Sequence, residues 1–235
     1  MPNHAVVSPA DWTEARKALL AKEKEFTRLR DELSRERRAL PWERVDKRYV
    51  FHGPDGEQTL ADLFAGRPQL IVQHLMFDPS WDVACKSCSF WADGYNGFAV
   101  HIEQRDTSFV AVSLAPIEKL QAFKRRMGWN FPWVSSFGSD FNRDFQVSET
   151  PEEKANGNSY YNYRIGPPFS SERPGISVFY RDDDGTVFHT YSCYARGLDM
   201  MNGAYQYLDL TPKGRDEDAL SFSMAWVRLH DQYAA

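Results

Sequence analysis

Residues 69–102 read QLIVQHLMFDPSWDVACKSCSFWADGYNGFAVHI, and this stretch decides the fold. Its first nine residues, 69–77, are mostly apolar and carry β-branched side chains near their start, which predicts a buried central strand. A polar loop follows, and then Cys85 and Cys88, spaced C-x-x-C, stand at the start of a predicted helix. A strand, a loop and a helix that opens on a cysteine pair indicate an α/β protein.

The alternation of strand and helix continues on both sides of this stretch. The pattern predicts strands at 49–52, 107–114, 176–180 and 186–194, and helices at 116–127 and 198–207. The last two strands flank Asp-Asp-Asp-Gly, a strong hairpin signal. Residues 131–171 are rich in loop residues, and we expect an insertion or a lid there. The last part of the chain, which contains Pro-Lys-Gly-Arg-Asp at 212–216, is expected to be a polar tail.

Residues 8–40 predict one long helix at the N-terminus. Ser8 suits the cap, Pro9 suits the first helical position, and Pro41 ends the helix. Its apolar residues recur at spacings of three and four, with Lys22 filling one slot, and form a narrow seam: Trp12, Ala15, Leu19, Phe26, Leu29 and Leu33. Such a seam needs a cover, either its own domain or a second copy of the chain in a homodimer. We therefore expect a helical arm over 1–41 and a second domain over 42–235.

Composition excludes several classes of protein. The 235 residues are 42% hydrophobic and 26% charged, so wholesale disorder is excluded. The formal net charge of −5 argues against a nucleic-acid binder, which would have to neutralise phosphates. The apolar runs are too short to cross a bilayer, and the first residues lack the pattern of a signal peptide. We expect a cytoplasmic protein without a membrane or nucleic-acid partner.

The cysteine pair carries the chemistry. Three cysteines are too few, and odd in number, for a disulfide framework. A thiol at a helix N-terminus faces unpaired N–H groups that favour the thiolate, and Lys86 adds a nearby positive charge. Cys85 could then attack a disulfide, and Cys88, one turn along, could resolve the mixed disulfide. Asp82 is a candidate proton acceptor for Cys88.

Three other interpretations remain open. Zinc could be held by the cysteine pair together with His189 and Cys193, but residues 186–194 predict a strand, along which residues four apart lie roughly 13 Å from each other. A peroxiredoxin-like peroxidase needs a hydroxyl beside the thiolate, and the position that should supply it holds Asp82 or Val83. The pair could also be silent in a non-catalytic binding module.

Long strings across nearly the whole chain carry a family resemblance: RRALPWERV, TLADLFAGRPQLIVQHLMF, CKSCSFWADGYNG, VAVSLAPIEKLQAFKRRMGWNFPWVSS, GSDFN, PGISVFYRDDDGTVFHTYSCYARGLDMMNGAY and LDLTPKGRDE. The chain resembles the DUF899 family, described as thioredoxin-like or predicted dithiol–disulfide oxidoreductases. The resemblance implies a thioredoxin-like three-layer α/β fold with a mixed sheet. It implies that Cys85 attacks and Cys88 resolves. The chain departs from the commoner pattern at Lys86, where proline is frequent, and at Cys193, where threonine is frequent.

The resemblance also implies substrate-binding residues near the pair. Pro174 stands where thioredoxin folds carry a cis-proline, so we expect the Arg173–Pro174 bond to be cis and Gly175 to leave room beside the sulfurs. Trp81 and Lys86 are the other candidates for substrate contact. The expected partner is a thiol or disulfide, either a protein or a small molecule, and no cofactor or metal is expected. His74, inside an apolar strand, is expected to be a hydrogen-bonded core residue.

Overall fold

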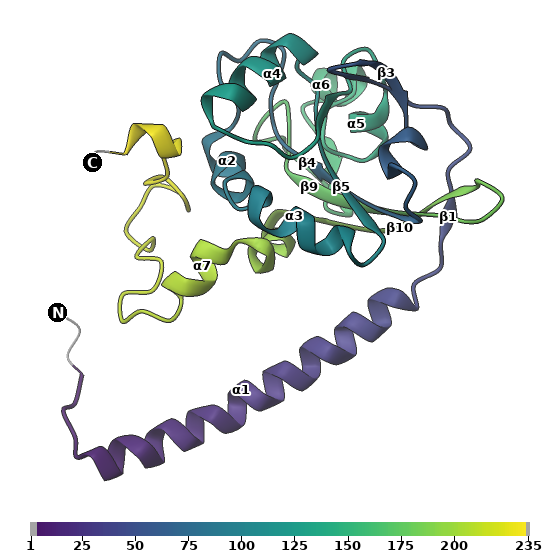
Figure 1. Cartoon of the computed structure of the whole chain (residues 1–235). Coiled ribbons are helices and arrows are strands. Elements are labelled where there is room, and N and C mark those ends of the chain that lie inside the picture. The colour runs from purple at the N-terminus through teal and green to yellow at the C-terminus, as the bar shows by residue number, and fades with distance from the viewer. Residues whose placement is uncertain (1–3, 234–235) are drawn as a thin grey trace. The chain divides into compact units, whose positions relative to one another are not determined.

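The computed structural model describes residues 4–233 and has two compact units, Met1–Pro41 and Trp42–Ala235 (Figure 1). The first unit contains helix α1, Pro9–Arg38, which confirms the predicted N-terminal helix. Ser8 caps it, because its Oγ accepts a hydrogen bond from the Asp11 N–H at 3.2 Å. None of the residues of α1 is buried. Across residues 4–233, no helix is both long enough and apolar enough to cross a membrane.

Eight strands of the second unit, among the described residues, form one mixed sheet (Figure 1). Their order is β1-β10-β9-β4-β5-β6-β2-β3. In chain order the strands are β1 (Glu43–Arg44), β2 (Val50–Gly53), β3 (Gly56–Thr59), β4 (Gln69–His74), β5 (Thr107–Ser113), β6 (Trp133–Ser135), β9 (Gly175–Arg181) and β10 (Val187–Tyr194).

The centre of this sheet has thioredoxin-like topology. β4 and β5 are parallel, β9 runs antiparallel to β4 on its other side, and β10 runs antiparallel to β9. The segment that follows β4 forms the helix with the cysteine pair, and the hairpin β9–β10 lies beside β4 rather than beside β5. The predicted thioredoxin-like fold is therefore confirmed, with the cysteine pair after the central strand.

Helical segments cover both faces of the sheet, so the domain has three layers. Alternate residues of β5 point to opposite faces. Phe109 belongs to the core cluster that includes residues of α2 (Lys86–Ala92), α3 (Tyr95–Glu103) and α4 (Ile117–Arg126), whereas Val110 belongs to the cluster that includes residues of η1 (Asp62–Phe64) and α5 (Phe141–Asp144). The single helix expected after the cysteines is two helices, because Asp93 and Gly94 interrupt it.

The stretch 131–171 is only partly the loop that its composition predicts. Its first residues form β6, which pairs parallel with β5 inside the main sheet. The strand escaped prediction because it has only three residues and follows a proline. Beyond α5, the stretch holds α6 (Pro151–Asn156) and a small hairpin of β7 (Ser159–Tyr161) and β8 (Arg164–Gly166).

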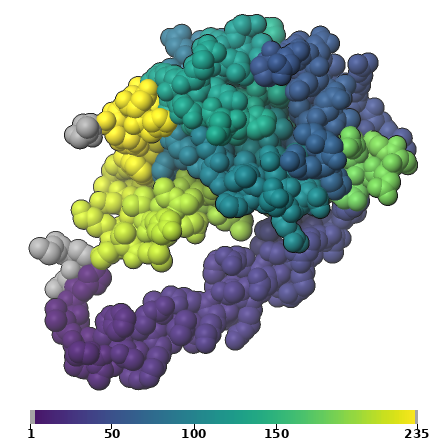
Figure 2. Space-filling view, viewed as in Figure 1, coloured from purple at the N-terminus to yellow at the C-terminus, as the bar shows by residue number. Residues whose placement is uncertain are grey.

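The C-terminal segment packs onto the domain rather than trailing from it. After β10 come η2 (Ala195–Met201), α7 (Gly203–Leu208) and, further on, η3 (His230–Gln232). Val227 and Leu229 are 0% and 2% exposed. Figure 2 shows this segment, yellow-green to yellow, lying against the teal residues of the domain. The expectation of a polar tail is therefore wrong, since its end supplies apolar side chains to the core.

Candidate active site

The first turn of α2 is held at the end of the central strand. The Cys85 N–H donates to the Met76 carbonyl at 3.0 Å, just beyond β4. Cys85 is the N-cap residue of α2, and its carbonyl accepts from both the N–H and the Oγ of Ser89 at 2.9 Å. These bonds fix Cys85 where the unpaired N–H groups of the helix point toward its sulfur.

The two thiols are free and interact with each other. Cys85 is partly buried and Cys88 is buried. The Cys88 thiol donates a hydrogen bond to the Cys85 sulfur, and this bond is the largest cause that lowers the pKa of Cys85 to about 6. Burial opposes the shift in pKa, whereas the backbone N–H groups of Ser87 and Cys88 support it. Cys85 is therefore the more acidic thiol of the pair.

Cys88 is held as the thiol. Its hydrogen bond to Cys85 raises its pKa well above the ordinary value, and burial and repulsion by the Cys85 thiolate raise the pKa further. Glu172, 2% exposed, adds a smaller repulsion that also raises the pKa of Cys88. Burial in turn raises the pKa of Glu172 to about 8, although Ser148 and Asn142 donate hydrogen bonds to it. The pair thus combines a ready thiolate with a proton-holding partner.

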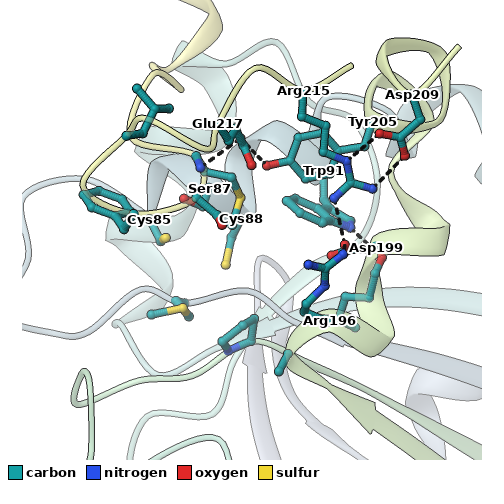
Figure 3. Close-up of a pocket in the computed structure, with 18 of the residues that line it drawn as sticks. Cys85, Ser87, Cys88, Trp91, Arg196, Asp199, Tyr205, Asp209, Arg215 and Glu217 are labelled. Carbon is teal, nitrogen blue, oxygen red and sulfur yellow. Dashed lines mark hydrogen bonds and ion pairs between the residues drawn. The ribbon is translucent and has the colours of Figure 1, made fainter. Parts of the chain in front are cut away.

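The dithiol opens into a pocket of about 1150 Å³. Met76 and Trp91 line it beside the cysteines, and Tyr161 and Phe169 line it from the β7–β8 region. The Trp91 Nε1–H donates to the Leu198 carbonyl at 3.0 Å, which fixes the ring against η2. Figure 3 shows the cysteines and Trp91 together with charged residues that come from η2 and from the C-terminal segment. The pocket is large enough for a small organic molecule.

Pro174 lines the same pocket as both cysteines, but its expected geometry is wrong. No cis peptide bond occurs in the described part of the chain, so the Arg173–Pro174 bond is trans. The backbone here is held on both sides, since Arg173 N–H donates to Val147 O at 2.7 Å and Pro174 O accepts from Tyr161 Oη at 2.7 Å. Gly175 makes room for the Tyr194 ring, which a Cβ would meet at 2.8 Å, rather than for the sulfurs.

The structure does not bring Trp81, Lys86 or Asp82 into this pocket. Trp81 packs against the core, and Trp91 is the tryptophan that lines the cavity. The Lys86 ammonium donates to the Ala225 carbonyl at 3.3 Å, so it is directed to the C-terminal segment. Asp82 is exposed, and the carboxylate whose charge acts on Cys88 is Glu172.

The histidines take structural positions. His74 is 1% exposed, its Nε2 lies 2.9 Å from Ser177 Oγ, and burial lowers its pKa to about 3, which confirms the expected core residue. His189 and Cys193 lie on strand β10, as the argument against a four-ligand zinc site required. Within residues 4–233, no three His, Cys, Asp or Glu side chains gather in a metal-binding arrangement.

The charged residues of the pocket were not predicted from the sequence. Arg215 and Glu217 lie in the part expected to be a tail, yet both line the cavity. Arg215 bonds to Asp199 and Asp209, and Glu217 bonds to Tyr205 (Figure 3). The signal that pointed to them is the string LDLTPKGRDE at 208–217, which the family resemblance includes.

Comparison with known proteins gives a family and distant structural likenesses. A family model described as "Bacterial protein of unknown function (DUF899)" matches residues 1–233. No curated protein matches the chain. Peroxiredoxin Q of Xanthomonas campestris is 15% identical with a TM-score of 0.44, over 72% of this chain and 98% of that one. A putative protein disulfide isomerase of Bacteroides thetaiotaomicron is 16% identical with a TM-score of 0.39, over 66% and 82%.

Proposed function

The chain belongs to the DUF899 family, and we propose that it is a thiol–disulfide oxidoreductase that uses Cys85 and Cys88 as a redox dithiol. One arrangement carries the proposal: two free thiols stand one turn apart at the start of α2, directly after the central strand, and both line an open pocket. Disulfide exchange needs an attacking thiolate and a second thiol within reach of the first sulfur, and this arrangement supplies both. The dithiol also faces a pocket rather than the core alone.

The reaction takes place in two exchanges. The Cys85 thiolate attacks one sulfur of a substrate disulfide, the substrate S–S bond breaks, and one substrate thiolate leaves. Cys88 then loses its proton and attacks the Cys85 sulfur, which releases the second substrate thiol. The dithiol is oxidised to a Cys85–Cys88 disulfide, the substrate is reduced to two thiols, and an external dithiol restores the starting state. Once Cys85 is no longer an anion, its repulsion of the Cys88 thiolate is gone, so the second exchange becomes easier.

The test is a single-turnover reaction of the reduced protein with 2-hydroxyethyl disulfide. The wild type should release both halves of the probe, whereas Cys88→Ser should release one half and retain the other as a mixed disulfide in the intact mass. Cys85→Ser should release neither, and Cys193→Ser, the matched control, should behave as the wild type. Equal reaction of Cys85→Ser and wild type would overturn the assignment.

Two further measurements separate the other interpretations. A purified protein that contains stoichiometric zinc, with thiols that do not react after reduction, would assign a metal-holding or silent pair. Consumption of hydrogen peroxide by Cys85 much faster than consumption of disulfides would assign a peroxidase instead.

A further inference from the structure

The C-terminal segment forms a fixed wall of the dithiol pocket. Residues 213–218 line the cavity, and Arg215 fastens them to the helices beside it. Its guanidinium bonds to Asp199 at 2.8 Å and to both oxygens of Asp209 at 2.9 Å, and it lies 3.9 Å from the centre of the Tyr205 ring. Because Arg215 is shared between two aspartates, its charge is already neutralised and the wall stays in place.

Glu217 presents a carboxylate in this wall that forms no ion pair, although the charge of Arg215 acts on it from a distance. Its Oε1 accepts three hydrogen bonds from neutral donors: Tyr205 Oη at 2.8 Å, Met224 N at 2.9 Å and Trp226 Nε1 at 2.7 Å. Burial acts to raise the pKa of Glu217, but the three donors, together with the positive charge of Arg215, outweigh it and hold the pKa below the ordinary value. None of the ion pairs formed within residues 4–233 includes Glu217. It is a fixed negative charge at the cavity surface.

The lining of the pocket as a whole carries a net negative charge, like Glu217 itself. Five carboxylates face three cations around the cavity: Asp199, Asp209, Asp216, Glu217 and Asp218 against Arg196, Lys213 and Arg215. The Cys85 thiolate adds a further negative charge. An anionic disulfide would be repelled as it approached the sulfur, and a cationic one attracted.

We propose that the pocket takes a low-molecular-weight disulfide whose halves carry a positive charge, as amine-bearing disulfides do, with its ammonium group paired to Glu217. The inference rests on the proposed function and names the substrate class of that site. The reaction is the exchange already described, so the amine-bearing disulfide is reduced to two aminothiols while the cysteine pair is oxidised, and a dithiol reductant such as dithiothreitol restores it.

The experiment compares disulfides of different charge in the wild type and in Glu217→Gln. Glutamine keeps the oxygen that accepts from Tyr205, Met224 and Trp226, so the wall keeps its bonds. The ratio of wild-type to variant rate cancels the intrinsic reactivity of each probe. We expect about a fivefold ratio for dicationic cystamine, a ratio of one for neutral 2-hydroxyethyl disulfide and a ratio below one for anionic 3,3′-dithiodipropionate. Added salt should reduce the cystamine ratio.

The control is a carboxylate outside the pocket. Glu57→Gln removes a carboxylate on the exposed strand β3, outside the pocket, and should leave all three rates unchanged. Equal ratios for the three probes, or faster reduction of insulin than of cystamine by the wild type, would overturn the substrate class while the oxidoreductase remains. A wild type that reacts with none of the disulfides would overturn the proposed function itself.

A separate feature, the exposed apolar seam of α1, points to a second copy of the chain. Trp12, Leu19, Phe26, Leu29 and Leu33 are between 49% and 66% exposed. They occupy the a and d positions of a heptad in which Trp12 is a. Lys22 falls at a d position and reduces the stability of the seam without interrupting it.

The charges beside the seam distinguish the possible arrangements of two such helices. The g positions are acidic or neutral: Asp11, Ala18, Glu25 and Glu32. The e positions are mostly basic: Arg16, Glu23, Arg30 and Arg37. In a parallel pair each g residue meets the e residue five positions later on the other helix, which places Asp11 with Arg16, Glu25 with Arg30 and Glu32 with Arg37. An antiparallel pair would instead place acidic g residues together and basic e residues together.

We infer that α1 forms a parallel, in-register coiled coil with α1 of a second copy. Sedimentation equilibrium of the full chain should give a dimer, and Glu25→Arg with Glu32→Arg should weaken it by about thirtyfold or more in dissociation constant. Adding Arg30→Glu and Arg37→Glu restores opposite charges and should restore the dimer. A monomeric wild type, with the seam covered by its own domain, would overturn the inference.

Cross-linking tests the direction of the helices. In a chain whose native cysteines are changed to serine, Leu29→Cys should form a covalent dimer on oxidation, because identical d positions face each other only in a parallel register. Lys24→Cys, on the opposite side of the helix, is the control and should not cross-link. A dimer in which Leu29→Cys cross-links no better than Lys24→Cys would rule out the parallel arrangement.

Discussion

Replacing Cys88 by alanine should remove the largest cause of the acidity of Cys85. In the wild type the Cys88 thiol donates to the Cys85 sulfur, and the pKa of Cys85 is lowered to about 6. An ordinary thiol titrates near 8.5, so at pH 5 about a tenth of Cys85 is thiolate, against roughly 0.03% of an ordinary cysteine. In Cys88→Ala only the backbone N–H groups and Ser87 still favour the thiolate, so the pKa of Cys85 should rise.

The rate advantage of Cys85 over an ordinary thiol is modest, because a thiolate of lower pKa is also a weaker nucleophile. With a Brønsted slope of about 0.45, a shift of about 2.5 units lowers the intrinsic rate roughly 13-fold. The gain in thiolate is about 300-fold at pH 5 and about 30-fold at pH 7, so Cys85 should react roughly 20-fold faster than an ordinary thiol at pH 5. At pH 7 the advantage is only about twofold. The midpoint of the pH profile is therefore more informative than a single rate.

The assay follows thiopyridone release from 2,2′-dithiodipyridine between pH 4 and pH 10. Cys193→Ala is the control and should keep the wild-type midpoint, since Cys193 is not among the causes of the shift in the pKa of Cys85. A wild-type midpoint at or above about 8.5, or the same midpoint in Cys88→Ala, would refute the reasoning.

Three further changes have expected outcomes. Burial raises the pKa of Glu172 to about 8, above its unfolded value near 4.3. The contribution of the protonated side chain to stability is therefore fully present below about pH 4.3 and is lost as the pH rises through about 8. Glu172→Gln, which cannot ionise, should raise the free energy of unfolding in urea by about 1 kcal/mol or more at pH 9 relative to its effect at pH 5. An equal effect at both pH values would contradict this. Gly175→Ala should destabilise by about 1–3 kcal/mol, because its Cβ would lie 2.8 Å from the Tyr194 ring; Gly203→Ala, with no atom within 4 Å, is the matched control. Trp133→Ala should cost about 3–5 kcal/mol, since the ring is 1% exposed in the core, and a loss below 1 kcal/mol would mean that β6 is not part of it.

The central part of the fold was predictable because its signals are local. The mostly apolar stretch at 69–77, the cysteine pair after it and the hairpin turn at 182–185 each define an element without reference to distant contacts. The resemblance then supplied the topology. β6 was not predictable, since three residues are too few to show an alternation and its place depends on pairing with β5.

In the candidate site, too, only the residues with a local sequence signal were predictable. Cys85 and Cys88 follow from spacing and from the start of a helix, whereas Trp91 rather than Trp81 lines the pocket because of how α2 turns against η2. Asp82 was chosen for nearness in sequence, but the carboxylate that acts on Cys88 comes from Glu172, far along the chain. Charged side chains such as Glu217 have no periodic signal, so their role depends on tertiary contacts.

The wall supplied by residues 213–218 has a consequence for biosynthesis. The cysteines leave the ribosome well before this segment, because 215 − 85 = 130 residues separate Cys85 from Arg215. At elongation rates of about 5–20 residues per second the interval is roughly 6–26 seconds. During that time the strands that support Cys85 can pair while the pocket lacks the side chains of Arg215 and Glu217. A nascent chain would then carry an acidic thiol without the charged wall that favours cationic disulfides over anionic ones. During synthesis the thiol of Cys85 therefore becomes reactive before the pocket can select disulfides by their charge.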